Sequence, residues 1–263
     1  MPVVASSGID IYYEIHGNPE AEKTLVFAHG MGGNAAIWFN QIVRFRDHYR
    51  IVTFDHRYFA RSSCSVDDFD PTKFPADVLA IMAAENIDSA IFVCQSMGGW
   101  TGSQLAINYP EKVDALVMSH TPGIFYHADA LNDQEAVAQK VSTIGAESSP
   151  ALAYDYPQKN PKGALLYRMI SAFNGIDNAV IPAKINGAQV GVNTDSLKDY
   201  SVPTLFITGE LDILFPASFI QTLAATLPGA ECENLGDVGH SSYFESPDAF
   251  NDVLATFLTR HCS

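Results

Sequence analysis

No stretch of this 263-residue chain is apolar for long enough to cross a membrane. Its first residues, Met1 to Ser7, lack a basic segment followed by an apolar one, so we expect no signal peptide and a cytoplasmic protein. Positive charge is also scarce, because 15 Lys and Arg residues stand against 30 Asp and Glu residues, a formal net charge of -15. Nucleic acids and anionic membranes repel such a surface, and we therefore expect neither as a partner.

Cysteine is rare as well. The four that occur, Cys64, Cys94, Cys232 and Cys262, form no C-x-x-C pair or other spacing typical of metal ligands. A chain of this length needs no disulfides to stabilise its core, which fits reduced thiols in the cytoplasm. The sequence has no cluster of His, Asp and Glu with ligand spacing either, so we expect no metal and no cofactor.

Short apolar runs alternate with amphipathic segments over much of the chain. The runs are typical of buried parallel strands, and they lie at Thr24–Ala28, Tyr49–Phe54, Ala90–Val93, Asp114–Ser119 and Pro203–Thr208. Before them, Pro2–Ala5 and Ile9–Ile15 form an expected hairpin. The alternation predicts one α/β domain, with a mainly parallel sheet of about eight strands and helices on both faces.

The alternation of apolar runs and amphipathic segments stops between Pro122 and Lys198. Helical patterns appear, best over Leu131–Ile144 and Lys162–Phe173, without a clear buried strand. These segments are either surface helices packed on the core or a cap inserted over the site. We favour a helical cap over residues 122–198, with the core formed by 1–121 and 199–263. Three aromatic residues of this insertion are candidates for a substrate pocket: Tyr154, Tyr167 and Phe173.

The chemistry centres on Ser96. An apolar strand ends at Cys94-Gln95-Ser96-Met97-Gly98-Gly99, and a helical segment follows it. Strand, sharp turn and helix form the context of a nucleophile elbow, whose usual pattern is G-x-S-x-G. Cys94 stands in place of the first glycine and is small enough for the turn. The alternative is an ordinary turn with a capping serine.

A nucleophilic serine needs a base, and the base needs an acid that holds its tautomer. His240 and Asp212 each follow a predicted strand, and the order along the chain is Ser96, Asp212, His240. Parallel strands place such loops at one edge of the sheet, so the three side chains can converge. A glycine-rich loop after another strand, His29 to Gly33, is a candidate for half of an oxyanion hole, and it lacks a phosphate-loop pattern.

With these motifs, the chain resembles the α/β-hydrolase superfamily over nearly its full length. The matching pieces are the His29-Gly30 loop, Asp55-x-Arg57, the serine elbow, Gly209-x-x-Asp212 and Gly239-His240. The resemblance implies that Ser96 is the nucleophile, His240 the base and Asp212 the acid. It also implies that the amides of Met31 and Met97 bind the oxyanion. Within the superfamily, Ser96-Met97-Gly98-Gly99 resembles small esterases, enol-lactonases and carbon–carbon bond hydrolases.

Several residues compete with these assignments or depart from the family pattern. Tyr58 and Ala60 stand where many relatives have glycine, which adds bulk on one side of the expected pocket. His120 also follows a core strand, but no acid is evident near it, so we expect it to line the pocket. Asp237 lies close to His240 in sequence, although the strand-end position of Asp212 suits a triad acid better.

The sequence predicts a serine hydrolase that cleaves small to medium carboxylic esters or lactones through an acyl-enzyme. One alternative is hydrolysis of a carbon–carbon bond in an anionic ring-fission product, for which Arg57, Arg61 or Arg168 could bind the anion. Another is a ligand receptor or a cofactor-free oxygenase on the same fold. The sequence indicates no particular oligomeric state.

Overall fold

The computed structural model describes residues 2–144, 149–177 and 180–262 and contains an eight-stranded sheet. The strand order is β1-β2-β4-β3-β5-β6-β9-β10. The strands are β1 (Val3–Ser6), β2 (Ile9–Gly17), β3 (Thr24–Ala28), β4 (Arg50–Phe54), β5 (Ala90–Gln95), β6 (Val113–Ser119), β9 (Thr204–Thr208) and β10 (Glu231–Asn234). This confirms the prediction of an α/β fold with about eight strands.

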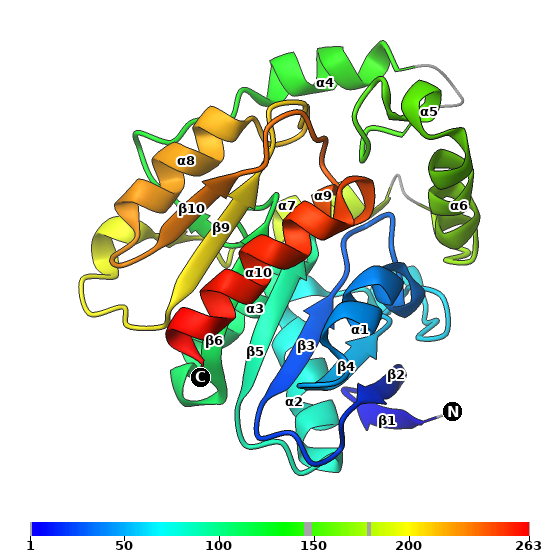
Figure 1. Cartoon of the computed structure of the whole chain (residues 1–263), viewed down its shortest axis with the longest axis vertical. Coiled ribbons are helices and arrows are strands. Elements are labelled where there is room, and N and C mark those ends of the chain that lie inside the picture. The colour runs from blue at the N-terminus through cyan, green and yellow to red at the C-terminus, as the bar shows by residue number, and fades with distance from the viewer. Residues whose placement is uncertain (1, 145–148, 178–179, 263) are drawn as a thin grey trace.

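The direction of the strands follows their burial. The hairpin of β1 and β2 pairs antiparallel with β4 at one edge, and all pairs from β4 to β10 are parallel. Every residue of β3, β5 and β9 is buried, because helices cover both faces of a parallel sheet. The carboxyl ends of β3, β5, β6, β9 and β10 therefore meet at one edge (Figure 1).

Helices form a layer on each face of the sheet, and each layer has its own hydrophobic cluster. On one face α2 (Phe74–Ala84), α3 (Gly98–Asn108) and α8 (Ala217–Thr226) pack on Val26 and Phe92. On the other face α1 (Phe39–Phe45) and α10 (Pro247–His261) pack on Phe27 and Val93. α9 (Ser242–Glu245) precedes α10, and short 3-10 helices span Ala35–Trp38, Val66–Asp68, Pro71–Lys73, Pro110–Lys112 and Thr194–Ser196.

The described residues between β6 and β9 form four further α-helices: α4 (Gln134–Ser142), α5 (Tyr156–Lys159), α6 (Pro161–Ala172) and α7 (Val180–Gly187). α4, α5 and α6 lie beyond the carboxyl ends of the strands (Figure 1). The expected helices over Leu131–Ile144 and Lys162–Phe173 correspond to α4 and α6. The segment also contains a feature that we did not expect, a parallel pair of two-residue strands, β7 (Phe125–Tyr126) and β8 (Val192–Asn193). None of the described helices is long and apolar enough to cross a membrane.

Candidate active site

Ser96 stands directly after β5 in a strained backbone conformation, with φ of +50°. A non-glycine residue with positive φ is uncommon, and nucleophile elbows hold their serine in this way. The turn needs small neighbours: a Cβ atom at Gly98 would lie 2.2 Å from the carbonyl oxygen of Ala28, and one at Gly102 would lie 2.5 Å from Sγ of Cys94. Cys94 thus fills the space beneath the turn, and burial raises the pKa of its thiol, which keeps it protonated.

His240 and Asp212, in the loops after β10 and β9, contact each other. Nδ1 of His240 lies 2.9 Å from Oδ2 of Asp212, and both side chains are buried. Oδ1 of Asp212 accepts the amides of Leu214 at 2.8 Å and Phe215 at 3.0 Å. Burial by itself would raise the pKa of Asp212, but the electrostatic interaction with His240 and the hydrogen bonds from His120 and His240 outweigh it and lower that pKa. Asp212 is therefore ionised at neutral pH.

His240 and Ser96 line the same cavity. The other ring nitrogen of His240, Nε2, is buried and has no hydrogen-bond partner among the described residues. The side-chain amide of Gln95 donates to the carbonyl oxygen of His240 at 3.0 Å, which ties the histidine loop to the residue before Ser96. An ionised carboxylate only accepts hydrogen bonds, so Nδ1 of His240 must carry the proton and Nε2 is left as a base.

Two backbone amides in this region have no hydrogen-bond partner among the described residues. Met31 follows β3, and Met97 occupies the N-cap position of α3; neither amide donates to another group in the described part of the chain. His29 holds the loop, since its Nδ1 lies 2.7 Å from the carbonyl oxygen of Gly30 and its Nε2 accepts the amide of His56 at 3.0 Å. Burial lowers the pKa of His29 to about 4, so the ring is neutral when it accepts that bond.

A cavity of about 540 Å³ joins these groups. Ser96, His240 and Met31 contribute to its wall from the core, and α6 closes it from the insertion. The remaining lining residues carry no carboxylate: Gly32, Gln95, Ser149, Pro150, Ala151, Tyr167, Arg168, Ser171, Ala172 and Leu214. The cavity thus adjoins the buried His240, the strained Ser96 and Met31, and Met97 follows Ser96 in the chain without lining it.

Comparison with known proteins agrees with this arrangement. The family profile described as the alpha/beta hydrolase fold matches residues 23–247. The chain belongs to the α/β-hydrolase family. A relative from Yersinia enterocolitica, named as a candidate carbamate hydrolase, RutD, is 28% identical over 94% of this chain and 92% of its own length.

Solved structures share the fold of this hydrolase over nearly its whole length. The enol-lactonase from Burkholderia xenovorans LB400 has a TM-score of 0.80 at 23% identity, covering 98% of this chain and 100% of its own. A thermophilic esterase from Thermogutta terrifontis has a TM-score of 0.80 at 20% identity, covering 100% and 99%. At such identities the likeness shows the fold alone, while family membership and the names of relatives support hydrolase activity.

The hydrolase structure corrects the expectation for His120. Its ring is fully buried and does not contribute to the wall of the Ser96 cavity. The expectation that no acid lies near it is wrong, because its Nδ1 lies 2.9 Å from Oδ2 of Asp212. The two residues are 92 positions apart, yet β6 and β9 are neighbours in the sheet, so their ends bring the side chains together. Asp237, by contrast, is exposed.

Two of the three candidate aromatic residues of the insertion lie away from the cavity. Tyr167 lines it, whereas Tyr154 and Phe173 do not and are 68% and 77% exposed. Tyr58, which we expected to add bulk beside the pocket, does not line the cavity either; it packs on Phe69. For Tyr167 and Phe173 the outcome depends on their position around α6. Tyr167 lies on the buried face of the helix, whereas Phe173, six residues further on at the C-cap, faces solvent.

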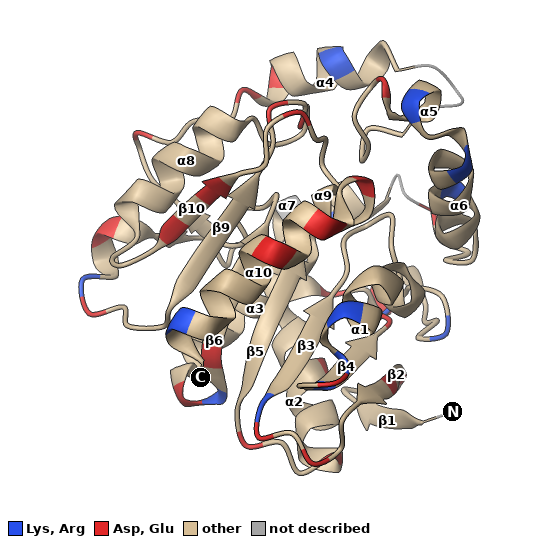
Figure 2. Cartoon of the chain, viewed as in Figure 1, with Lys and Arg blue, Asp and Glu red and all other residues tan. Residues whose placement is uncertain are grey.

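The three candidate arginines differ in their surroundings. Arg57 is fully buried and makes a two-pronged ion pair with Asp77, at 2.7 and 2.5 Å. Arg61 pairs with Asp55 and with Glu14. Arg168 lines the Ser96 cavity and has no carboxylate partner among the described residues. It belongs to α6, a helix with two basic residues and no acidic one (Figure 2).

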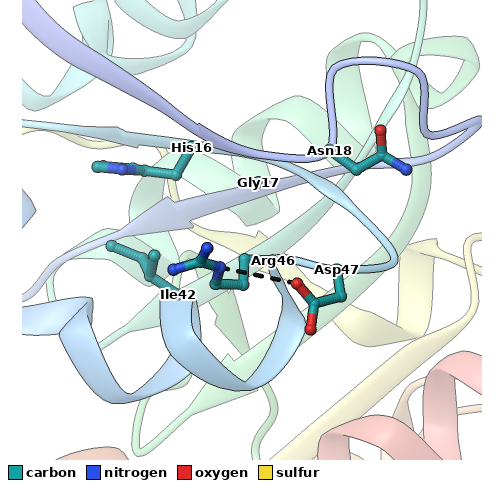
Figure 3. Close-up of a pocket in the computed structure, with 6 residues that line it drawn as sticks. All are labelled: His16, Gly17, Asn18, Ile42, Arg46 and Asp47. Carbon is teal, nitrogen blue, oxygen red and sulfur yellow. Dashed lines mark ion pairs between the residues drawn. The ribbon is translucent and has the colours of Figure 1, made fainter.

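A second hollow, of about 390 Å³, lies at the end of β2 beside α1 (Figure 3). Its wall is formed by His16, Gly17, Asn18, Ile42, Arg46 and Asp47, and Arg46 pairs with Asp47 at 3.7 Å. It shares no residue with the Ser96 cavity, and it contains no nucleophile with an adjoining base. This second hollow therefore offers no activated serine for hydrolysis.

Proposed function

We propose that the protein is a serine hydrolase that cleaves small to medium carboxylic esters or lactones. The observation that carries the proposal is the pairing of His240 with Asp212, which leaves Nε2 of His240 without a partner among the described residues, in a histidine that lines the same cavity as Ser96. A base in this state can take the proton of a serine hydroxyl, which is otherwise a weak nucleophile.

In the proposed reaction, Ser96 attacks the carbonyl carbon while His240 accepts its proton. The amides of Met31 and Met97 bind the oxyanion, since donors aimed at developing charge lower the barrier most. The intermediate collapses to an acyl-enzyme when His240 donates its proton to the leaving oxygen. Water then attacks the acyl carbon while His240 accepts its proton. The second intermediate collapses as His240 returns that proton to Oγ of Ser96, which releases the acid and restores the serine.

The experiment is labelling with a fluorophosphonate probe followed by peptide mapping. We expect one label, on Ser96, and none in Ser96→Ala. Ser171→Ala is the matched control, because Ser171 lines the same cavity and should leave labelling intact. A Ser96→Ala variant that keeps its esterase activity would contradict the proposal.

The insertion, residues 122–198, is proposed to act as a cap that shapes the substrate pocket. α6 supplies Tyr167, Arg168, Ser171 and Ala172 to the cavity wall, which supports this role. A cap of this kind sets which acyl or alcohol groups fit, while the core supplies the reacting groups.

A second candidate, hydrolysis of a carbon–carbon bond in an anionic substrate, is favoured by Arg168. In a chain of net charge -15, an arginine without a carboxylate partner among the described residues lines the cavity. A substrate carboxylate is a suitable partner for a guanidinium group. The relatives named as carbamate hydrolases make carbamates a third class to assay.

The substrate classes separate in one panel: p-nitrophenyl esters, lactones, carbamates and a ring-fission product, each with native protein and Arg168→Gln. We expect Arg168→Gln to raise KM about tenfold for substrates that carry a carboxylate and to leave neutral esters unchanged. Equal effects on both groups would remove the anionic candidate, and turnover of neutral esters alone would leave the ester proposal.

A further inference from the structure

Asp212 is shared by two histidines. Its Oδ2 lies 2.9 Å from Nδ1 of His240 and 2.9 Å from Nδ1 of His120. The imidazole rings meet edge to face, with centroids 5.7 Å apart, and His120 is fully buried. A serine, a base and an acid complete the proposed chemistry without this second histidine, so its place on the acid needs an explanation.

The proton on each nitrogen can be deduced from the contacts. Asp212 is ionised and only accepts, so both Nδ1 atoms must donate to Oδ2. Nε2 of His120 lies 2.8 Å from Oγ of Ser242, whose hydroxyl donates to it. Burial lowers the pKa of His120, despite Asp212, which keeps the ring neutral. His120 is therefore a fixed neutral donor whose own lone pair is occupied, and it cannot replace His240 as the base.

We propose that His120 is a positioning residue that holds Asp212 and weakens the proton affinity of His240. The inference rests on the proposed serine-hydrolase function. Oδ2 divides its negative charge between two donors, so each receives less stabilisation than a lone partner would. The hydrogen bond from His120 to the carboxylate therefore disfavours protonation of His240, because the negative charge of Asp212 is what stabilises the imidazolium. The base then stays available at lower pH than it would beside Asp212 alone.

Other groups also act on His240. Glu245, in α9, interacts electrostatically with it, and the ring of Phe215 packs against it with a centroid distance of 5.7 Å. Glu245 accepts the amides of Gly239 and Ser241, which flank the histidine. None of these contacts includes His120, so we expect a change in the pH profile of variants at position 120 to report on the bond between His120 and Asp212.

The test compares His120→Asn with His120→Leu. Asn has an amide nitrogen where His has Nδ1 and also tolerates the φ of +53° at this position, whereas Leu offers a methyl group of similar shape. Both variants lose the contact with Ser242, and Ser242→Ala serves as the control for that loss. The readout is kcat/KM for a neutral ester between pH 5 and 9, together with the melting temperature.

We expect the low-pH limb of the His120→Leu profile to shift toward higher pH by about half to one pH unit. His120→Asn and Ser242→Ala should stay close to the native profile. A His120→Leu profile that matches the native one, in a variant that folds and remains dependent on Ser96, would overturn the inference. Loss of dependence on Ser96 would instead contradict the serine-hydrolase proposal, so the two failures are distinguishable.

If His120→Leu does not fold, histidine side-chain NMR of the native protein decides. We expect His120 to carry its proton on Nδ1, with Nε2 unprotonated, from pH 5 to 8. A neutral His120 with its proton on Nε2 in this range would overturn the inference, because Nδ1 would then not be a donor to Asp212.

Discussion

Asp212 keeps a buried negative charge because four N–H groups surround it. Two backbone amides hold Oδ1 and two imidazoles hold Oδ2. Buried carboxylates of this kind are strongly sensitive to substitution, since the loss of one acceptor leaves donors without partners. The residue is therefore both the proposed acid and the point that holds three loop segments together.

Asp212→Asn is expected to lower kcat/KM by about a thousandfold or more, because an amide cannot accept four donors and favours the wrong tautomer of His240. His240→Ala should cost at least as much, and the double variant should lose little beyond it, since the residues act as a unit. Steady-state kinetics on a p-nitrophenyl ester measure these changes. Asp237→Asn is the control, as Asp237 is exposed. Near-normal turnover in Asp212→Asn would show that the acid has been misassigned.

At the scale of elements, α6 connects the insertion to the reacting groups. Its buried positions, Ala164, Tyr167 and Ile170, recur every three residues and pack in the same hydrophobic cluster as Phe244 of α9. The ring of Tyr167 packs edge to face against the ring of Phe244, with their centroids 5.1 Å apart. It also closes on the loop of Met31, because a Cβ atom at Gly32 would lie 2.7 Å from its hydroxyl oxygen. The helix can therefore influence pocket shape directly.

Tyr167→Leu is expected to reorder ester substrates by about tenfold, since contacts in an apolar pocket are worth about 1–3 kcal/mol. Specificity constants for short and long esters measure the effect. Tyr154→Leu and Phe173→Leu are controls, because both aromatic rings are exposed and outside the cavity wall. A uniform loss on all substrates with a lower melting temperature would instead assign Tyr167 to packing.

At the scale of the whole molecule, neutral histidines are buried in a strongly acidic chain. Burial lowers the pKa of His29 to about 4, and it also lowers the pKa of His56 and of His120. The unfolded chain binds protons at an ordinary histidine pKa of about 6.5. Below about pH 6.5 these histidines bind protons in the unfolded chain, whereas in the folded chain they remain neutral to lower pH. The free energy of unfolding therefore has its full value above about pH 6.5 and falls as the pH drops below it.

His56→Phe tests this linkage. His56 is fully buried against Phe54 and Phe74, and a phenyl ring keeps these contacts while it loses the hydrogen bond of 2.8 Å between Nε2 and Oγ1 of Thr101. We expect the slope of unfolding free energy against pH, from urea denaturation between pH 7 and 4.5, to fall by up to about 1.4 kcal/mol per pH unit. His48→Gln, at an exposed position, is the control. An unchanged slope in His56→Phe would contradict the linkage.

The sequence by itself determined the fold and the places where chemistry can occur. Apolar runs, glycines and strand-end polar residues are local patterns, and parallel strands carry their ends to one edge. For this reason the eight-stranded sheet, the strained turn at Ser96 and the strand-end positions of Asp212 and His240 could be predicted. The same patterns did not reveal the short pair of β7 and β8, because two-residue strands leave too little periodicity.

Only the tertiary structure distinguished residues whose local sequence contexts are alike. His120 and His240 both follow core strands, and their roles separate only through contacts with Asp212 and Ser242. Arg168 was distinguished from Arg57 and Arg61 by pairing and burial, which depend on elements distant in sequence. Tyr167 alone of the three aromatic residues turned toward the cavity. The physical reason is the same in each case. The partners of a side chain and the face that a helix buries are set when separate segments pack, and a local sequence pattern contains no information on which segments those are.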